Sequence, residues 1–148
     1  MTSPKIDIGR PTTLDDVSAR ALDAILADAR NHLVPSDAWL EPAADRVGEA
    51  EVDEERWVYV ARVNGEPAGL LDAQLGSPEP GVVTIVHVAV ARPHRRHGVG
   101  RALVEALVRD ASEGGCALVR ACVLDRQSEG FWPELDFERV GEEYRRGL

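Results

Sequence analysis

The chain has 148 residues, 44% of them hydrophobic and 29% charged, which is ordinary for a globular protein and predicts a single domain over residues 1–148. Its formal net charge of −9 at pH 7 argues against nucleic acid as a general partner, because nucleic-acid binding needs a basic face. No apolar run is long enough to cross a bilayer, and residues 1–5 show no signal-peptide pattern, so we expect a cytoplasmic protein without a membrane partner.

The first third of the chain predicts one strand and two helices. Residues 6–10 alternate between apolar and polar side chains, as is typical of a strand. Residues 13–16 resemble a capping box and start an amphipathic helix that ends within 31–35. A second helix is expected within 36–49, where Pro42 must either break or start it. The apolar face of the first helix is formed by Leu14, Val17, Ala21, Leu22, Ile25 and Ala29.

Three strands are expected next, at residues 56–63, 68–75 and 82–90. The turn between the first two is Asn64-Gly65, which is the strongest short-range signal for a β-hairpin. Short turns between all three strands predict an antiparallel meander. The acidic run before them, residues 41–55, carries seven acids and one arginine and is either a solvated face or a rim that attracts a cationic acceptor.

The last third predicts a helix between two parallel strands. Apolar side chains recur at helical spacing from residue 98 until Gly114 and Gly115 end the helix. A helical crossover makes the following strand, 116–124, parallel to 82–90. A short helix within 127–135 and a last strand at 137–144 complete an α/β (α+β) fold with a mixed sheet. The only cysteines, Cys116 and Cys122, lie in one predicted strand and are expected to be buried thiols; no metal site is expected.

The turn between strand 82–90 and the helix has the composition of an anion site. Residues 92–101 contain four arginines and two histidines and no acid. The first N–H groups of a helix have no intrahelical partner, and Gly98 and Gly100 allow a ligand to approach the backbone closely. These features favour a phosphorylated ligand; the alternative is a solvated basic turn whose glycine caps the helix.

The residues of this turn argue against two common classes of phosphate-binding turn. It lacks the Gly-Lys-Ser/Thr end of a Walker loop, and Leu103 stands where a dinucleotide fingerprint has its third glycine. The hexapeptide Arg95-Arg96-His97-Gly98-Val99-Gly100 after Val90 instead resembles the signature of the GNAT superfamily of N-acetyltransferases. A second patch supports this resemblance, because Phe131-Trp132 stands for the family's aromatic pair and Asp136-Phe137 for its Gly-Phe. The order of predicted elements is also similar to the GNAT fold, with helices on both faces of the sheet.

The resemblance implies transfer of an acetyl group from acetyl-CoA, as acyl-donor substrate, to a primary amine of a small molecule or peptide. It implies that Val88 and Val90 pair with the pantetheine arm, and that the Val88 N–H faces the thioester oxygen. It also allows a homodimer. The other residues that it assigns to the cofactor are Arg95, Arg96, His97, Gly98, Val99, Gly100, Arg101, Asp125 and Trp132.

Several positions depart from the family's catalytic pattern. Thr84 and Arg120 stand where the family often has a glutamate base, and Trp132 stands in place of its tyrosine acid. Asp125 replaces a frequent asparagine, and an ionised carboxylate cannot donate the hydrogen bond of an amide. Cofactor binding is therefore better supported by the sequence than any catalytic side chain.

Three side chains are candidates for the missing roles. His87 has a suitable pKa for a base, although a core histidine is the alternative. Tyr144 is a candidate acid if the last strand curls over the cleft, and a core or surface tyrosine is the alternative. Arg120 is a candidate ligand for a carboxylate on the acceptor, or else a strand arginine paired with a nearby acid. Water as the proton carrier would leave no trace in the sequence.

Two other functions stay open at this point. A non-catalytic acyl-CoA-binding sensor or partner module would explain the missing glutamate and tyrosine. A nucleotide-binding α/β domain of another kind is opposed by the meander, because dinucleotide folds place the glycine turn after their first strand.

Overall fold

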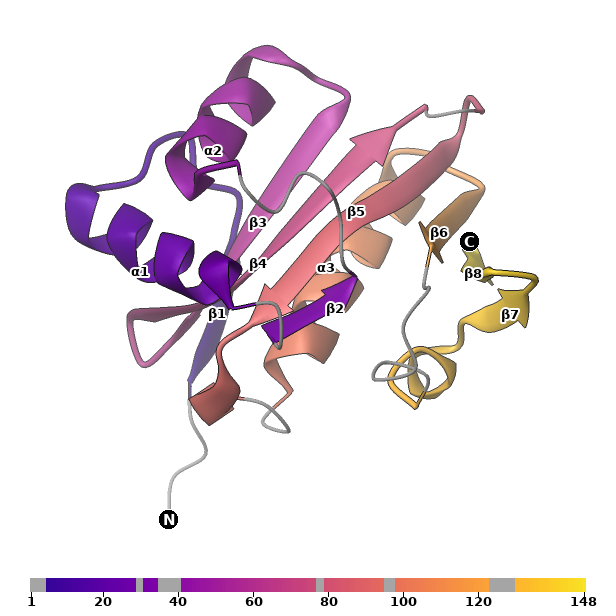
Figure 1. Cartoon of the computed structure of the whole chain (residues 1–148). Coiled ribbons are helices and arrows are strands. Elements are labelled where there is room, and N and C mark those ends of the chain that lie inside the picture. The colour runs from indigo at the N-terminus through magenta and orange to yellow at the C-terminus, as the bar shows by residue number, and fades with distance from the viewer. Residues whose placement is uncertain (1–4, 29–30, 35–40, 77–78, 95–97, 123–129) are drawn as a thin grey trace.

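The computed structural model describes residues 5–28, 31–34, 41–76, 79–94, 98–122 and 130–148 (Figure 1). Within these residues, eight strands form one sheet. Its main path has the order β1-β3-β4-β5-β6-β8-β7, and β2 pairs with β5 beside this path. The strands are β1 (Ile6–Gly9), β2 (His32–Val34), β3 (Arg56–Val63), β4 (Glu66–Leu75), β5 (Val82–Val90), β6 (Leu118–Cys122), β7 (Glu138–Val140) and β8 (Glu143–Gly147).

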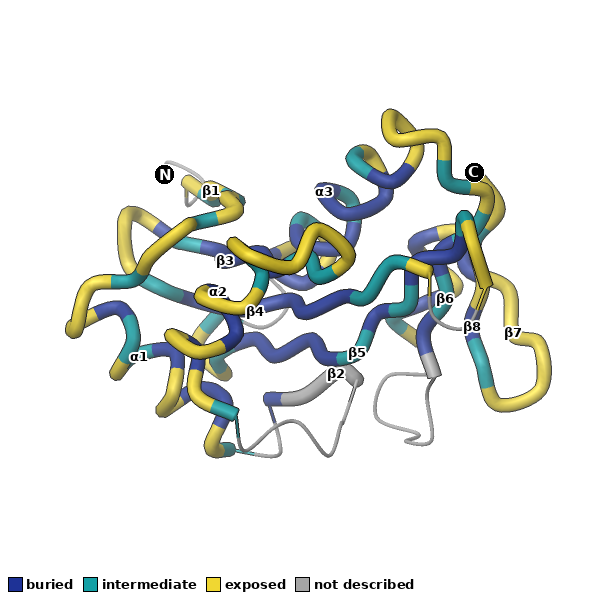
Figure 2. The backbone as a smooth tube through the Cα atoms, turned by 90° about the horizontal axis from the view of Figure 1, so that it is seen from above, coloured by how far each residue is buried: buried dark blue, intermediate teal, exposed yellow. Residues whose placement is uncertain are grey.

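Helices cover both faces of the sheet (Figures 1 and 2). α1 (Asp16–Ala27) and α2 (Ala43–Val52) lie on one face, and α3 (Val99–Glu113) lies on the other. Two apolar cores result, the larger under α3 and the smaller under α1 and α2. The described helices include none that is long and apolar enough to span a membrane. The buried face of α3 is formed by Val99, Gly100, Leu103, Val104, Ala106, Leu107, Val108 and Ala111.

The mixed sheet predicted from the sequence is confirmed. β3, β4 and β5 form an antiparallel meander. β5 and β6, which α3 connects in the chain, pair with each other in parallel. Asn64 and Gly65 both have positive φ, at 51° and 86°, which is the conformation that a tight hairpin turn requires.

The first two helices differ in detail from the prediction. Asp15 caps α1 by accepting a hydrogen bond from the Ser18 N–H at 2.6 Å. Val17, expected on the apolar face, is 78% exposed, because the buried stripe of α1 passes through Ser18 instead. Pro42 directly precedes the first turn of α2 and therefore starts this helix.

The C-terminal region also needs correction. The prediction of a single strand at 137–144 is wrong, because the chain there forms the antiparallel pair β7 and β8. Gly141 has a φ of 64° in the connecting turn, a conformation that glycine adopts readily. In the region expected to hold a short helix, the structure describes a 3₁₀ turn at Pro133–Leu135, and residues 127–129 lie outside the described part. β2, within the expected end of the first helix, was not predicted.

A β-bulge in β5 sets which way its side chains face. Asp72 of β4 pairs with His87 and Ala73 pairs with Ile85, so Val86 has no partner on β4. As a result both Ile85 and Val88 face the core under α3. His87 faces the opposite layer, where it contacts Arg46 of α2.

Gly69 of β4 allows the first turns of α3 to lie directly on the sheet. A Cβ atom there would be 2.8 Å from the Ala89 carbonyl oxygen and 3.3 Å from Leu103 Cδ1.

We expect Gly69→Ala to lower the free energy of unfolding, measured by urea denaturation, by about 1–3 kcal/mol, because overpacking is destabilising. Gly48→Ala is the control, because a Cβ in the middle of α2 would meet nothing within 4 Å. It should stabilise by about 0.5–1 kcal/mol. Equal effects of both changes would contradict this packing.

Candidate functional site

The edge of β5 loses its pairing with β6 part of the way along the strand. The parallel register runs from Val82–Leu118 to Ile85–Ala121, whereas β4 pairs with β5 as far as Val90. The last part of β5 therefore presents to the β6 side an edge that β6 does not use. Backbone groups at such an edge can bind an extended ligand as an added strand.

The backbone of Val88 and Val90 faces this edge. The Ala91 N–H donates to the Ala68 carbonyl at 2.8 Å, on the β4 side. Backbone groups of successive residues in a strand point to alternate edges, so Ala89 also faces β4 and Val88 and Val90 face away from it. Both valine side chains are buried in the core under α3, which fixes this orientation.

β2 occupies part of the same edge (Figure 1). Val34 is the Cα partner of Val88, and His32 is the partner of Ala89, in an antiparallel pairing with an irregular register. An extended ligand that pairs with the backbone of Val88 must therefore replace β2 at this point.

α3 begins just beyond the end of β5, after a 3₁₀ turn at Arg92–His94. Gly98 is its N-cap, with a φ of 83° and no side-chain cap. The first intrahelical bond runs from the Ala102 N–H to the Gly98 carbonyl at 2.9 Å, so three N–H groups before it have no partner within the helix. They belong to Val99, Gly100 and Arg101. Such groups, together with the helix dipole, form a binding site for an anion.

Four of the residues predicted to bind the cofactor fall outside the part of the chain that the structure describes. They are Arg95, Arg96, His97 and Asp125. Of the others, Val88 and Val90 lie at the end of β5, and Gly98, Val99, Gly100 and Arg101 lie at the start of α3. Ala89 of β5 and Val99 of α3 both lie close to Gly69, so these two ends are near each other.

Trp132 and Tyr144 lie against each other on the α3 side of the sheet. Their rings stack at a centroid distance of 6.3 Å, and both side chains are buried. Tyr144 is the Cα partner of Ala121, which forms the last pair between β6 and β5. Tyr144 therefore lies at the level where the two strands part. Within the described residues the buried Nε1 of Trp132 has no hydrogen-bond partner, a costly arrangement that a ligand can relieve.

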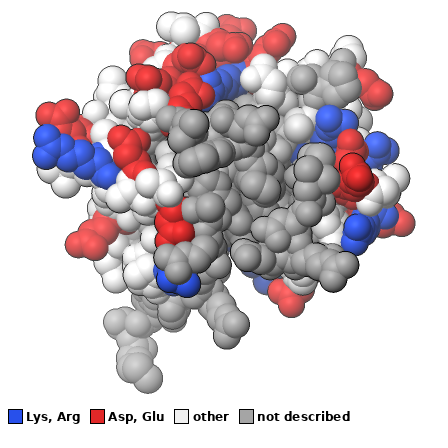
Figure 3. All heavy atoms as spheres, in the orientation of Figure 1, with Lys and Arg blue, Asp and Glu red and all other residues white. Residues whose placement is uncertain are grey.

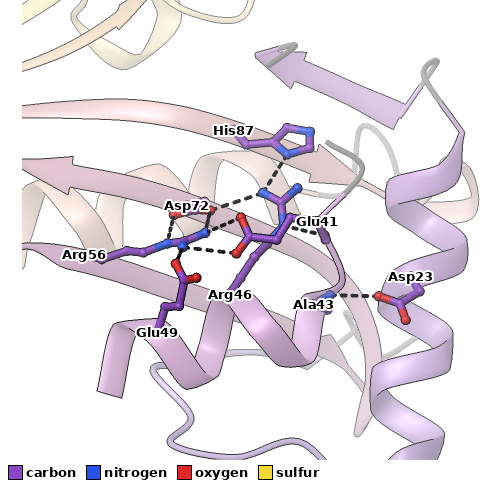
Figure 4. A network of polar contacts seen from close by, with 8 residues as sticks. All are labelled: Asp23, Glu41, Ala43, Arg46, Glu49, Arg56, Asp72 and His87. Carbon is purple, nitrogen blue, oxygen red and sulfur yellow. Dashed lines mark hydrogen bonds and ion pairs between the residues drawn. The ribbon is translucent and has the colours of Figure 1, made fainter. Parts of the chain in front are cut away.

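His87 belongs to a buried polar cluster on the opposite face, beneath α2 (Figure 4). Its Nδ1 lies 3.1 Å from Nη1 of Arg46, and both residues are fully buried. A guanidinium only donates hydrogen bonds, so Nδ1 must accept and the ring proton lies on Nε2. This contact gives His87 a structural partner, and its role as a base stays a prediction.

Asp72 is the centre of that cluster. Its carboxylate accepts from Arg46 at 3.1 Å and from Arg56 through two bonds, at 2.7 and 3.2 Å. Arg56 also pairs with Glu41 and Glu49, two members of the acidic run. Burial lowers the pKa of Arg46, and the nearby carboxylate of Asp72 offsets part of that effect. Burial also lowers the pKa of Arg56, but its hydrogen bonds and charge interactions with Asp72 and Glu41 together have the larger, opposite effect. The net result is a pKa above the ordinary value.

The two positions where a glutamate base was expected are in direct contact. Arg120 Nε donates to the Thr84 hydroxyl at 2.9 Å, and its Nη1 donates to Glu143 at 3.1 Å. Arg120 is thus a strand arginine paired with an acid. Sequence reasoning missed Glu143, because its place beside β6 depends on the β7–β8 turn and on a register that no local signal encodes.

Comparison with known proteins agrees with this geometry. The sequence profile described as "Acetyltransferase (GNAT) family" matches residues 20–137. No curated protein sequence matches the chain.

Solved structures have the same fold. An acetyltransferase from Thermus thermophilus has a TM-score of 0.68 and 24% identity, with 100% of both chains covered. The PaiA N-acetyltransferase of Thermoplasma acidophilum, in complex with coenzyme A, has a TM-score of 0.68 and 12% identity over 97% of this chain and 99% of that chain. A GNAT-family acetyltransferase of Brucella melitensis, in complex with acetyl-CoA, has a TM-score of 0.67 and 14% identity over 97% and 88%.

The charge of Asp72 should be important for the stability of the fold. Asp72→Asn keeps the shape of the side chain but removes the charge that faces Arg46 and Arg56, so we expect a loss of about 3–5 kcal/mol in the free energy of unfolding. Glu51→Gln is the matched control, because Glu51 is an exposed acid of α2, and it should change stability by less than about 0.5 kcal/mol. A loss below about 1 kcal/mol for Asp72→Asn, measured by urea denaturation, would show that the cluster does not anchor α2.

Proposed function

The chain belongs to the acetyltransferase (GNAT) family, and on that premise we propose that it transfers an acetyl group from acetyl-CoA to a primary amine of a small molecule or peptide. The observation that carries the proposal is the coincidence of two features at one end of β5. These are an edge that β6 does not use and a helix start whose first N–H groups lack intrahelical partners. A phosphorylated ligand with an extended arm fits both.

The described residues supply the proposed cofactor contacts. The N–H groups of Val99, Gly100 and Arg101 would bind the pyrophosphate, and the edge at Val88 and Val90 would pair with the pantetheine arm. Gly98 and Trp132 also belong to the proposed set, as do Arg95, Arg96, His97 and Asp125, which lie outside the described residues. The Val88 N–H would stabilise the negative charge that develops on the thioester oxygen during transfer.

Acetyl transfer to an amine also requires two proton transfers. The acceptor amine must lose a proton and the departing thiolate gains one. We assign the acid to Tyr144, since it lies beside the level where β5 and β6 part, next to Trp132. His87 is a weaker candidate for the base, because its Nδ1 is engaged with Arg46. Solvent can also accept the amine proton.

A non-catalytic acyl-CoA-binding module is the second candidate. The observation that favours it is the pairing of β2 with β5 at Val88, together with Thr84 and Arg120 at the expected base positions. Incubation with acetyl-CoA and a panel of amines separates the two functions. Release of free thiol and a mass gain of one acetyl group identify the enzyme, whereas binding without turnover on any amine identifies the module.

Cofactor binding is tested by thermal unfolding with and without acetyl-CoA. A ligand that binds only the folded state raises the melting temperature, so acetyl-CoA should raise it and NAD should not. Gly98→Glu should abolish the shift, because it places bulk and negative charge at the start of α3. Gly115→Glu is the control, since Gly115 has a similar φ of 79° at the other end of the same helix. It should keep the shift; a shift with NAD alone would overturn the proposal.

The acid is tested by two substitutions in the stacked pair. We expect Tyr144→Phe to lower turnover at saturating acetyl-CoA by roughly 10²-fold, the size of a general acid's contribution. Trp132→Phe should stay within about tenfold of the parent enzyme, because an indole is no proton donor and a thiolate with a pKa of about 8–9 leaves without much help. An unchanged rate in Tyr144→Phe would remove Tyr144 from the site and leave solvent as the donor.

A further inference from the structure

A row of polar and charged side chains crosses the half of the sheet formed by β5, β6 and β8. Thr84, Arg120 and Arg145 are consecutive Cα partners across these strands, so their side chains share one face. Their neighbours Ile85, Ala121 and Tyr144 all face the core under α3, so the row faces the other way. This is the face of α1 and α2, which lie over β3, β4 and β5 and do not extend over β6 and β8 (Figure 1).

Two guanidinium groups in this row share one carboxylate. Glu143 accepts from Arg120 Nη1 at 3.1 Å and from Arg145 Nε at 3.0 Å. Glu138 is the Cα partner of Arg145, but within the described residues it makes no ion pair. Arg120, Arg145 and Glu143, called here the arginine cluster, together carry a net charge of +1 on a protein whose net charge is −9.

The arginine cluster has unused hydrogen-bond donors that solvent can reach. In the described part of the chain, Nη2 of Arg120 and both Nη atoms of Arg145 have no hydrogen-bond partner. The two side chains are 25% and 43% exposed, so a ligand can approach them. Planar guanidinium groups can bind a carboxylate through two parallel hydrogen bonds, and each arginine uses only one bond on Glu143. A single negative charge would neutralise the cluster.

The position of the cluster relates it to the proposed chemistry. Thr84 and Arg120 form the pair just before the last one, Ile85–Ala121, where β5 and β6 part. Along β5, Thr84 and Val88 lie on the order of 10–13 Å apart at the usual rise of a strand. On this face acidic side chains gather over α2, whereas basic and acidic side chains are mixed over β6–β8 (Figure 3).

We propose that the arginine cluster binds a carboxylate of the acceptor, so that the acceptor is an amine that carries a carboxylate several bonds away. This inference rests on the proposed acetyl transfer at Val88 for its meaning, but binding to the cluster can be measured without turnover. Arg120 is then a specificity-determining residue that holds the acceptor, and Glu143 is a positioning residue that orients both guanidinium groups.

The test compares matched acceptors on the protein saturated with CoA, which prevents acetyl transfer. γ-Aminobutyrate is compared by calorimetry with γ-aminobutyramide, which keeps the size and loses the carboxylate, and glycine with glycinamide as the shorter pair. We expect the parent protein to bind γ-aminobutyrate about tenfold or more tightly than its amide, the size of a charge-assisted hydrogen bond. Arg120→Gln should remove that preference, and Arg120→Lys should restore part of it.

The control is Arg109→Gln on the far side of α3, where the side chain is 68% exposed, and it should leave the preference unchanged. Arg145→Gln serves as a second variant if Arg120→Gln fails to fold. Equal binding of acid and amide, no binding of either acid, or a preference that survives both arginine changes would overturn the inference. Acetylation of uncharged amines at rates equal to those of the acids would also overturn it while leaving the proposed function standing. If no amine is acetylated but the binding preference is intact, the proposed function is contradicted and the carboxylate site still stands.

Discussion

The register between β5 and β6 is the constraint on which the rest of the candidate site depends. The two strands are parallel neighbours only as far as Ile85 and Ala121, while β4 holds β5 to its end at Val90. β5 therefore stays in the sheet through its pairing with β4 beyond the point where β6 leaves it. That single mismatch in length creates the edge at Val88, and the same strand leads directly to the glycine turn and the start of α3.

The β-bulge at Val86 sets which layer each side chain near this edge packs against. Because it inserts one extra residue, the side chains before and after it, Ile85 and Val88, both pack under α3. His87 is turned to the opposite layer, where Arg46 of α2 contacts it. The backbone of Val88 is thus fixed by a core on one side and by the Asp72 cluster close by on the other. A rigid strand of this kind suits a backbone N–H that must be in place before charge develops.

Burying charged groups costs desolvation energy, so the intact Asp72 cluster adds little net stability, although removal of one partner is costly. We infer that its main role is to orient α2. Arg46 lies on α2, Arg56 on β3 and Asp72 on β4, and the cluster fixes the angle of α2 over the sheet. α1 and α2 do not extend over β6 and β8 on that face (Figure 1). The arginine cluster lies on the part of this face that α1 and α2 do not reach, and its two arginine side chains are partly exposed.

Local signals in the sequence predicted the elements that local physics determines. Asn64-Gly65 fixed the hairpin, and the glycines at 98 and 114 marked both ends of α3. Where structure depends on distant partners, the sequence was insufficient. β2 is recognisable only by its pairing with Val88, and Gly141 was read as part of a strand although it forms a turn. The contacts of Glu143 with Arg120 and of Asp72 with Arg46 join segments far apart in the chain, so no spacing rule could reveal them.

The most direct test of the account is a titration of isotope-labelled protein with CoA, followed through the backbone amide resonances. The account predicts the largest changes at Val88, Val90 and the first three residues of α3, with loss of the β2 pairing at Val34. Ala89 should change much less, because its N–H faces β4. Unchanged resonances at Val88 and Val90, with CoA bound and its effects confined to another part of the molecule, would contradict it.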